Sequence, residues 1–209
     1  MTRGRFITLE GIEGAGKSTL AAGLREVLLK RGIDVHLTRE PGGTPVAERI
    51  RRIVLERGEE TMAPEAEVLL MFAARRVHVD NVIRPRLAAG TWVICDRFTD
   101  ATRAYQGGGR GVDEALIERL AAAVHDDLLP DCTLLLDLEP TVGLGRVRQR
   151  GATPDRFEAE TLAFFERVRA RYLRIAAAEP FRVTRLDATL PPDAVLENAS
   201  RKVLELIDS

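Results

Sequence analysis

The sequence predicts a three-layer α/β/α fold in which helices cover both faces of a five-stranded parallel sheet. Short apolar segments alternate with longer segments of helical character along the chain, and this alternation is typical of parallel strands joined by helices. Hydrophobic residues make up 45% of the 209 residues, and one hydrophobic core can serve a chain of this length. We therefore expect a single domain over residues 1–209.

Five apolar segments are the predicted strands. They are rich in Ile, Val and Leu, as is typical of parallel strands that are buried on both faces. These segments cover residues 5–10, 33–40, 91–96, 132–138 and 181–188. Ligands of such sheets bind beyond the carboxyl ends of the strands, so the polar residues that follow each segment are the first candidates for a site.

Start and stop signals for helices lie between the predicted strands. Gly32, Gly58 and Gly90 follow helical segments, and glycine commonly follows the last residue of a helix. Pro85 lies inside a long helical segment and is expected to kink it or end it early. The predicted helices cover residues 17–31, 45–57, 63–89, 99–106, 112–126, 140–149, 158–178 and 191–207.

Composition excludes several classes of protein. The formal net charge is −1, whereas a nucleic-acid-binding domain is expected to be basic. Cys95 and Cys132 both lie in apolar strand segments and form neither a metal-binding nor a disulfide pattern. The N-terminal segment lacks the apolar core of a signal peptide, and no apolar run approaches the ~20 residues of a membrane span. We expect a cytoplasmic protein.

One motif binds phosphate by its backbone. Residues 11–18 match the pattern G-x-x-x-x-G-K-[ST] directly after a predicted strand and at the start of a helix, which is the P-loop context. Its backbone N–H groups are expected to surround the phosphates of ATP. Lys17 is expected to reach the β- and γ-phosphates and Ser18 to bind Mg²⁺. The predicted ATP-binding residues are Gly11, Ile12, Glu13, Gly14, Ala15, Gly16, Lys17 and Ser18.

The P-loop indicates a P-loop NTPase-type fold but not a reaction. Guanine-binding switch proteins carry Asn-Lys-x-Asp, and neither Asn81 nor Asn198 begins that motif. Residues 134–139 could form a Walker B strand, or only a core strand followed by a polar turn. A non-catalytic nucleotide switch and a kinase for another nucleoside monophosphate or deoxynucleoside both remain as alternatives.

Three further motifs follow the P-loop in order: Arg-Glu-Pro-Gly-Gly at 39–43, Asp-Arg-Phe at 96–98 and Tyr-Gln-Gly-Gly-Gly-Arg-Gly at 105–111. Together with the P-loop, they resemble the signatures of thymidylate kinases, and the resemblance runs from about residue 5 to the C-terminus. It implies direct in-line transfer of a phosphate from ATP to dTMP, with Mg²⁺ as cofactor, in dTTP biosynthesis. It also implies a homodimer.

The resemblance implies roles on the ATP side. Arg97 would lie between the donor and acceptor phosphates, and Asp96 would act near the metal, through water. Glu13 in the P-loop, with a basic lid at 146–158, resembles the largely bacterial type of the family. The lid carries Arg146, Arg148, Arg150 and Arg156; among these, Arg150 is our candidate for contact with the γ-phosphate and Arg146 for stacking on adenine.

The resemblance also implies an acceptor site. Arg51 would bind the acceptor phosphate, with Glu40 near the phosphate-binding arginines. Phe72 would stack on thymine, and an arginine three or four residues later would donate to a base carbonyl; Arg75 is favoured over Arg76. Thr102 and Gln106, four residues apart, would contact the polar edge of thymine, and Tyr105 would pack near the sugar. The predicted dTMP-binding residues are Glu40, Arg51, Phe72, Arg75, Arg97, Thr102, Tyr105 and Gln106.

Overall fold

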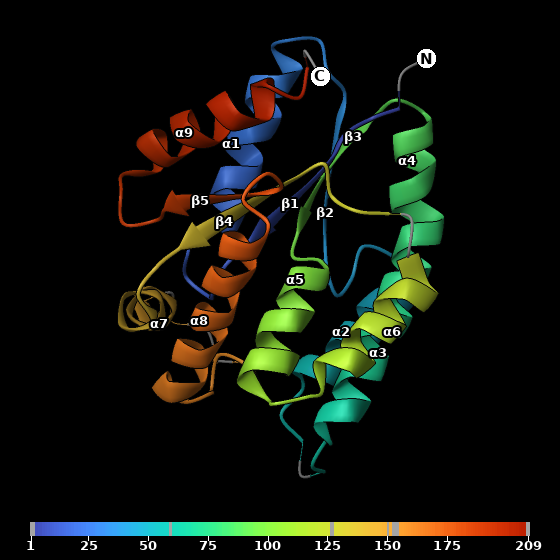
Figure 1. The fold of residues 1–209 in the computed structure, drawn as a ribbon, viewed down its shortest axis with the longest axis vertical. Helices are drawn as coiled ribbons and strands as arrows, with labels where there is room; N and C mark the ends of the chain where they lie inside the picture. Colours follow the sequence, from blue (N-terminus) through green and yellow to red (C-terminus); the bar gives the residue numbers. More distant parts are fainter. Residues whose placement is uncertain (1–2, 59, 126–127, 150, 152–154, 208–209) are drawn as a thin grey trace.

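The fold is that of a five-stranded sheet in which every strand pair is parallel, in the order β2-β3-β1-β4-β5 (Figure 1). The computed structural model describes residues 3–58, 60–125, 128–149, 151 and 155–207. The strands are β1 Phe6–Glu10, β2 Val35–Arg39, β3 Trp92–Asp96, β4 Cys132–Asp137 and β5 Val183–Asp187. Each lies within the segment that the sequence predicted, which confirms the predicted fold class.

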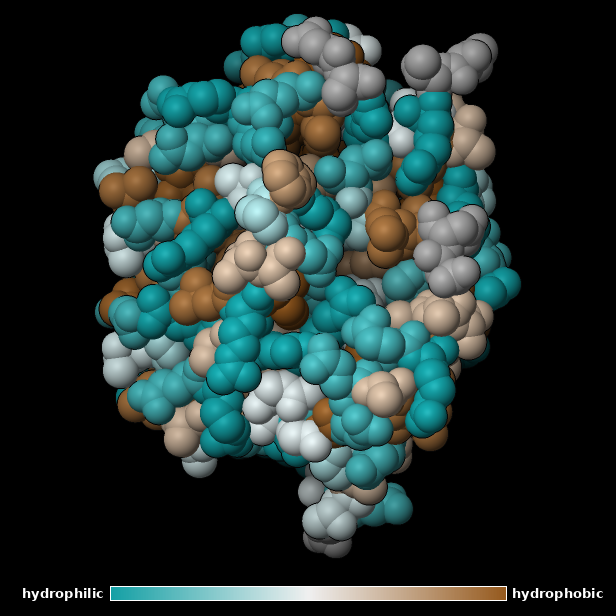
Figure 2. Space-filling model, viewed as in Figure 1, coloured by the Kyte–Doolittle hydropathy of each residue, from teal (hydrophilic) through white to brown (hydrophobic). Residues whose placement is uncertain are grey.

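Helices cover both faces of this sheet. They are α1 Lys17–Leu29, α2 Pro45–Leu55, α3 Pro64–His78, η1 Val79–Ile83, α4 Arg84–Ala88, α5 Thr99–Thr102, η2 Arg103–Gly109, α6 Glu114–His125, α7 Pro140–Gln149, α8 Leu162–Ala178 and α9 Pro192–Leu204, where η denotes a π-helical turn. Every helix among the described residues is too short or too polar to span a bilayer. Hydrophilic side chains cover much of the face seen in Figure 2.

Alternation along β1 separates the two packed layers, because successive side chains of a strand point to opposite faces. Phe6 packs with Ile83 and Leu87 of the η1–α4 segment. Ile7 and Leu9, which point the other way, belong to the core cluster that contains Leu20 and Leu24 of α1. On that side, α1 and α9 also pack against each other (Figure 1).

Two predicted helices differ from the observed ones. The long helix at Pro85 does not end: it passes through η1, and Pro85 lies in the first turn of α4, where a missing N–H costs little. Helix α8 begins at Leu162 and not at 158, because the hydroxyl of Thr161 accepts from the N–H of Phe164 and caps the helix there. The other predicted boundaries differ from the structure by a few residues.

Strand register brings three of the sequence motifs together. Asp96 of β3 pairs with both Leu9 of β1 and Arg39 of β2. The P-loop, the 39–43 turn and the 96–98 segment therefore leave the sheet side by side at its carboxyl edge. This is the edge at which parallel α/β sheets bind ligands.

Strand β4, which lies between β1 and β5, provides a test of the core. Leu134 is fully buried there, and shortening it leaves a cavity that the sheet cannot close. We expect Leu134→Ala to lower the free energy of unfolding by about 2–5 kcal/mol, measured by urea denaturation. The matched control is Leu129→Ala, since Leu129 is 62% exposed and should change stability by less than about 0.5 kcal/mol. Equal effects of the two changes would contradict this description of the core.

Candidate active site

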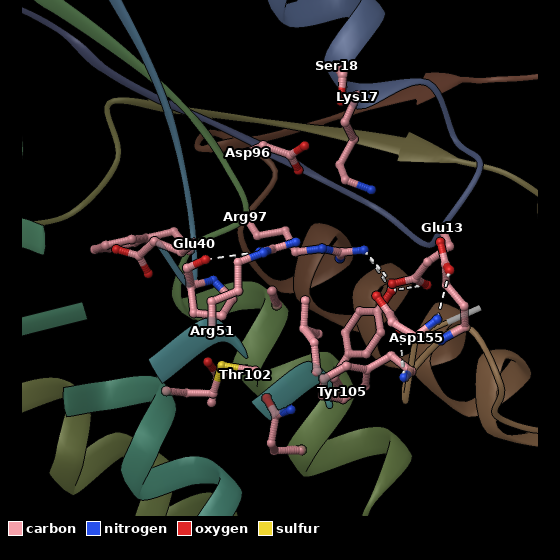
Figure 3. A pocket seen from close by; sticks show the side chains of 18 of the residues that line it. Glu13, Lys17, Ser18, Glu40, Arg51, Asp96, Arg97, Thr102, Tyr105 and Asp155 are labelled. Atoms are coloured by element: carbon pink, nitrogen blue, oxygen red, sulfur yellow. Dashed lines mark hydrogen bonds and ion pairs between the residues drawn. The ribbon is translucent and has the colours of Figure 1, made fainter. Parts of the chain in front are cut away.

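A cavity of about 250 Å³ opens at the carboxyl edge of the sheet. Its walls come from the P-loop, the ends of β2 and β3, the helices α2, α3 and α5, the η2 turn and residues 155–158. Figure 3 shows Lys17, Ser18 and Asp96 along one side and Thr102 and Tyr105 along the other, with Arg97 and Arg51 between them. Segments that are distant in sequence therefore share one polar cavity.

The P-loop is shaped by close backbone contacts. Gly14 has a φ of 76°, and a Cβ atom added there would lie 2.3 Å from the carbonyl oxygen of Gly143 in α7. Gly143 faces the same constraint, since its Cβ would lie 2.5 Å from the carbonyl oxygen of Glu13. Glycine alone fits both positions, so the loop lies directly against α7.

Lys17 lies inside the P-loop. Its ammonium group donates to the carbonyl oxygens of Gly11 (3.1 Å) and Ile12 (2.9 Å). Burial, together with the charge of Arg97, lowers the pKa of Lys17 to about 8. A charged group that binds beside Lys17 can therefore change the protonation of its ammonium group.

Arg97 is held from several directions. Its backbone has a φ of 72°, a left-handed conformation that costs a non-glycine residue ~1–3 kcal/mol. Its guanidinium donates to the carbonyl oxygen of Gly11 (2.9 Å), to a carboxylate oxygen of Glu13 (2.8 Å) and to the hydroxyl of Tyr105 (3.0 Å). Tyr172 of α8 accepts a longer bond of 3.3 Å. These contacts hold the guanidinium between the P-loop and the η2 turn.

Asp96 and Ser18 line the same side of the cavity. Oδ1 of Asp96 is buried and has no hydrogen-bond partner among the described residues. A carboxylate oxygen and a hydroxyl are ligands or hydrogen-bond acceptors suited to Mg²⁺ and its waters. The pair therefore fits a hydrated Mg²⁺ ion.

Glu40 and Asp137 are carboxylates that already form ion pairs and therefore do not fit a metal. Glu40, His78 and Cys95 lie close together and buried, but Glu40 already binds Arg75 and His78. Asp137, which ends the possible Walker B strand, accepts from Arg169 and Arg185. These ion pairs favour the reading of residues 134–139 as a core strand with a polar end.

Arg51 and Glu40 frame the 39–43 turn. Arg51 donates to the carbonyl oxygen of Pro41 (2.9 Å), and burial, with the charge of Arg39, lowers its pKa. Glu40 is 3% exposed; it accepts from Nε of Arg75 at 2.6 Å and from Nδ1 of His78 at 3.0 Å. Burial would raise the pKa of Glu40, but the charge of Arg75 and the bond from His78 leave it below the usual value.

The structure distinguishes the two candidate arginines of α3. Arg75 is 3% exposed and lines the cavity, where it also donates to the hydroxyl of Thr102 (3.1 Å). Arg76 points to the exposed side of the helix and binds Asp80. Arg75 is therefore the one of the two that lines the cavity.

Phe72 lies directly behind Arg75, and its stacking on thymine stays a prediction. Its ring lies beneath the guanidinium of Arg75 (4.7 Å) and stacks on His125 (6.4 Å between centroids), and it is not among the residues that line the cavity. Met71 lines the cavity in its place. Residues four apart share a helix face, so the spacing between Met71 and Arg75 was the available signal.

Thr102, Tyr105 and Gln106 all line the cavity. The hydroxyl of Tyr105 donates to Glu13 (2.6 Å), and its ring edge meets the ring of Phe157. Gln106 is 1% exposed, and its amide nitrogen donates to Glu67 at 2.6 Å. Helix α5 and the η2 turn thus present three polar side chains toward one wall.

Two arginines of the predicted lid segment, Arg146 and Arg156, lie in different places. Arg146 of α7 donates to the carbonyl oxygens of Gly14 (3.3 Å) and Ala188 (3.2 Å), beside the P-loop. Arg156 lies on the opposite side, where it binds Glu67 and the carbonyl oxygen of Val54 (2.8 Å). Arg150 lies outside the described residues. In this structure α2 and α3 hold Arg156 away from Arg146, and its place in a flap over ATP stays a prediction.

Several cavity residues had no signal in the motifs. Asp155 accepts from the N–H groups of Phe157 (2.8 Å) and Glu158 (2.9 Å) and so caps the turn before α8. All three side chains line the cavity. Only the folded chain brings this turn to the end of β3.

Comparison with known proteins agrees across sequence and structure. The thymidylate kinase family model matches residues 9–199. Thymidylate kinases of Alkalilimnicola ehrlichii and Pseudomonas fluorescens are 55% and 59% identical to this chain, over 94% and 90% of it and 90% and 89% of their own lengths. The crystal structure of thymidylate kinase from Ehrlichia chaffeensis superposes with a TM-score of 0.79 at 33% identity, covering 97% of this chain and 99% of that one.

The lowered pKa of Lys17 predicts how nucleotide affinity depends on pH. A bound triphosphate stabilises the charged ammonium and raises its pKa above 8, so binding takes up a proton in alkaline solution. Affinity for a non-hydrolysable ATP analogue should therefore be constant below pH 8 and fall up to about tenfold per pH unit above it. Isothermal titration calorimetry from pH 7 to 10 measures this dependence.

The matched control is Lys17→Arg. A guanidinium stays charged across this range, so the variant should bind more weakly but without a decrease above pH 8. A wild-type affinity that does not change between pH 7 and 10 would contradict the prediction.

Proposed function

The chain belongs to the thymidylate kinase family, and from this premise we propose how its cavity transfers a phosphoryl group from ATP to dTMP. The protein is an enzyme that phosphorylates dTMP to dTDP. The relatives do not favour the alternative of a kinase for another nucleoside or of a non-catalytic switch. One observation carries the mechanism: Lys17, Arg51 and Arg97, from three separate elements, line the same cavity.

The reaction needs cations more than a base. A phosphate monoester has a second pKa of about 6, so the attacking oxygen of dTMP is already ionised near pH 7. The barrier comes from bringing two polyanions together and aligning them. Preorganised positive groups are the usual means of lowering such a barrier.

On the donor side, the P-loop N–H groups surround the phosphates of ATP and Lys17 contacts the β- and γ-phosphates. Arg146 lies beside the outer face of the loop, where we place the adenine. Arg150 remains our proposed contact to the transferred phosphate. Glu13 binds both Arg97 and Tyr105, and so connects the donor loop to the acceptor wall.

On the acceptor side, Arg51 binds the phosphate of dTMP and Arg97 lies between the two phosphates. Arg75 donates to a carbonyl of thymine, while Glu40 orients its guanidinium. The polar edge of thymine contacts Thr102 and Gln106, and Tyr105 packs near the sugar. Phe72 supports Arg75 from beneath, and Met71 supplies the apolar surface against the base.

We propose Mg²⁺ as the cofactor. Ser18 would hold it directly and Asp96 through water, which accounts for the buried, unpaired Oδ1 of Asp96. When bound, the ion offsets charge on the β- and γ-phosphates.

Exposed apolar side chains and free thiols support proposals on assembly and location. We propose a homodimer, for which α2 and α3 offer exposed apolar side chains at Val46, Ile53 and Leu69. We propose a cytoplasmic location, where free thiols such as the buried Cys95 and Cys132 stay reduced. The enzyme would there supply dTDP for dTTP synthesis.

A coupled assay for ADP tests the function. Purified protein with ATP and Mg²⁺ should release ADP rapidly when dTMP is added, and far more slowly with dCMP, with UMP or without an acceptor. Faster turnover of another acceptor would redirect the assignment to that nucleotide. Slow ADP release that no acceptor increases would indicate a switch.

Replacing Arg97 tests whether its positive charge reduces the repulsion between the donor and acceptor phosphates. Arg97→Ala should lower kcat by about 10²–10³-fold, the typical cost of losing one charge-assisted contact that forms in the transition state. The KM for ATP should change little. Arg76→Ala is the matched control, since Arg76 is exposed on α3 and should leave kcat near the wild-type value. An unchanged kcat in Arg97→Ala would remove this residue from the mechanism.

Replacing Asp96 tests the proposed metal site. Asp96→Asn keeps the shape of the side chain but removes its charge. The Mg²⁺ concentration for half-maximal activity should rise by about 10–100-fold, as for other residues that orient metal-bound water. Titration of Mg²⁺ at saturating ATP and dTMP measures it. A lower kcat with an unchanged Mg²⁺ requirement would place Asp96 outside the metal site.

A further inference from the structure

A buried carboxylate on α3 lies directly behind the acceptor wall. Glu67 is 0% exposed and accepts a hydrogen bond of 2.6 Å from the amide nitrogen of Gln106. Its other oxygen binds the guanidinium of Arg156, and Nε of Arg110 lies 3.6 Å from that oxygen. Glu67 has no place among the motifs or among the residues that line the cavity.

Glu67 determines which way the amide of Gln106 faces. An ionised carboxylate only accepts hydrogen bonds, so the amide nitrogen of Gln106 must point toward it. The amide oxygen of Gln106 is then left for the cavity that the residue lines. That oxygen has no hydrogen-bond donor in the part of the chain that the structure describes. The wall therefore presents an acceptor at this point.

Arg75 presents the opposite polarity nearby. Glu40 holds its Nε and Thr102 its Nη2, while Nη1 is buried and unpaired among the described residues. Arg75 and Gln106 both line the cavity, which thus offers one donor and one acceptor. A thymine or uracil edge presents the complement, with O4 as acceptor and N3–H as donor. Cytosine presents the reverse, with an N4 amine as donor and N3 as acceptor.

We infer that Glu67 is a positioning residue that makes the enzyme selective for the thymine or uracil edge over the cytosine edge, by fixing the amide of Gln106. The inference rests on the proposed acceptor site. Glu67 itself does not touch the base, and the ion pair with Arg156 keeps it an acceptor.

The substitution Glu67→Gln should turn the amide of Gln106 over. Arg156 can only donate, so it takes the oxygen of the introduced amide and leaves the new NH₂ facing Gln106. Gln106 must then offer its own oxygen to that NH₂, which puts its amide nitrogen toward the base. A donor now meets the N3–H of thymine, whereas the N3 atom of cytosine gains a partner.

Acceptor kinetics measure this inversion. Because dUMP and dCMP differ only in the base edge, the ratio of their kcat/KM values isolates it, and dTMP is run beside them. Glu67→Gln should lower the ratio of dUMP to dCMP by about tenfold or more, the cost of at least one mismatched buried hydrogen bond. The KM for ATP should stay near the wild-type value. Glu65→Gln, on the exposed side of the first turn of α3, is the matched control and should leave the ratio unchanged.

A double variant keeps the inference testable if Glu67→Gln alone does not fold. In the double variant Glu67→Gln with Gln106→Glu, a carboxylate accepts from the introduced amide and again presents an oxygen to the base. Circular dichroism and thermal unfolding establish which variants fold. The double variant should recover a strong preference for dUMP over dCMP.

The following outcomes would contradict the inference or the proposed function. A folded Glu67→Gln enzyme that loses activity equally with dUMP and dCMP would overturn the inference, because Glu67 would then be only structural. A double variant without preference for dUMP would overturn it as well. If wild-type protein does not phosphorylate dTMP, the proposed function fails; if it does and the ratio persists in Glu67→Gln, only the inference fails.

Discussion

Positive charge held inside one cavity is the constraint on which the rest of this structure depends. Removing a cation from water costs free energy unless polar groups contact it. Main-chain carbonyl groups contact all three cations here: those of Gly11 and Ile12 bind Lys17, Gly11 also binds Arg97, and Pro41 binds Arg51. These dipoles stabilise the charges without neutralising them, and Arg97 in addition forms an ion pair with Glu13.

Buried carboxylates orient the side chains that they bind, whereas the carbonyl groups only stabilise the positive charges. Glu40 aligns Arg75, and Glu13 ties Arg97 and Tyr105 to the P-loop. Behind them, Glu10 accepts from the hydroxyl of Tyr172 (2.8 Å) and from the N–H of Phe98 (2.8 Å). Burial, and secondarily the charge of Asp100, raise the pKa of Glu10 to about 8. The wall behind the cations is therefore a network of polar contacts, which keeps the cations in one arrangement.

Much of the fold could be predicted because local patterns carry it. The strand segments could be recognised because their side chains are buried, throughout β1 and β4 and in part in the edge strands β2 and β5. The P-loop could also be recognised from the sequence. Its Gly14 lies so close to α7 that no residue with a side chain fits there. Helix ends were less predictable. The hydroxyl of Thr161 caps α8 and sets its first residue, and a π-helical turn before Pro85 lets the long helix continue. The hydrophobic periodicity of the sequence indicates neither feature.

By itself, the sequence determined the sheet, the phosphate-binding loop, the family resemblance and most residues of the cavity, because each is encoded within a short segment. Tertiary structure alone decided between Arg75 and Arg76, moved Phe72 behind Arg75 in favour of Met71, and separated Arg156 from Arg146. It also brought Glu67 behind Gln106. The physical reason is that the side of a helix or turn that is buried, and the groups that meet it there, depend on residues far along the chain.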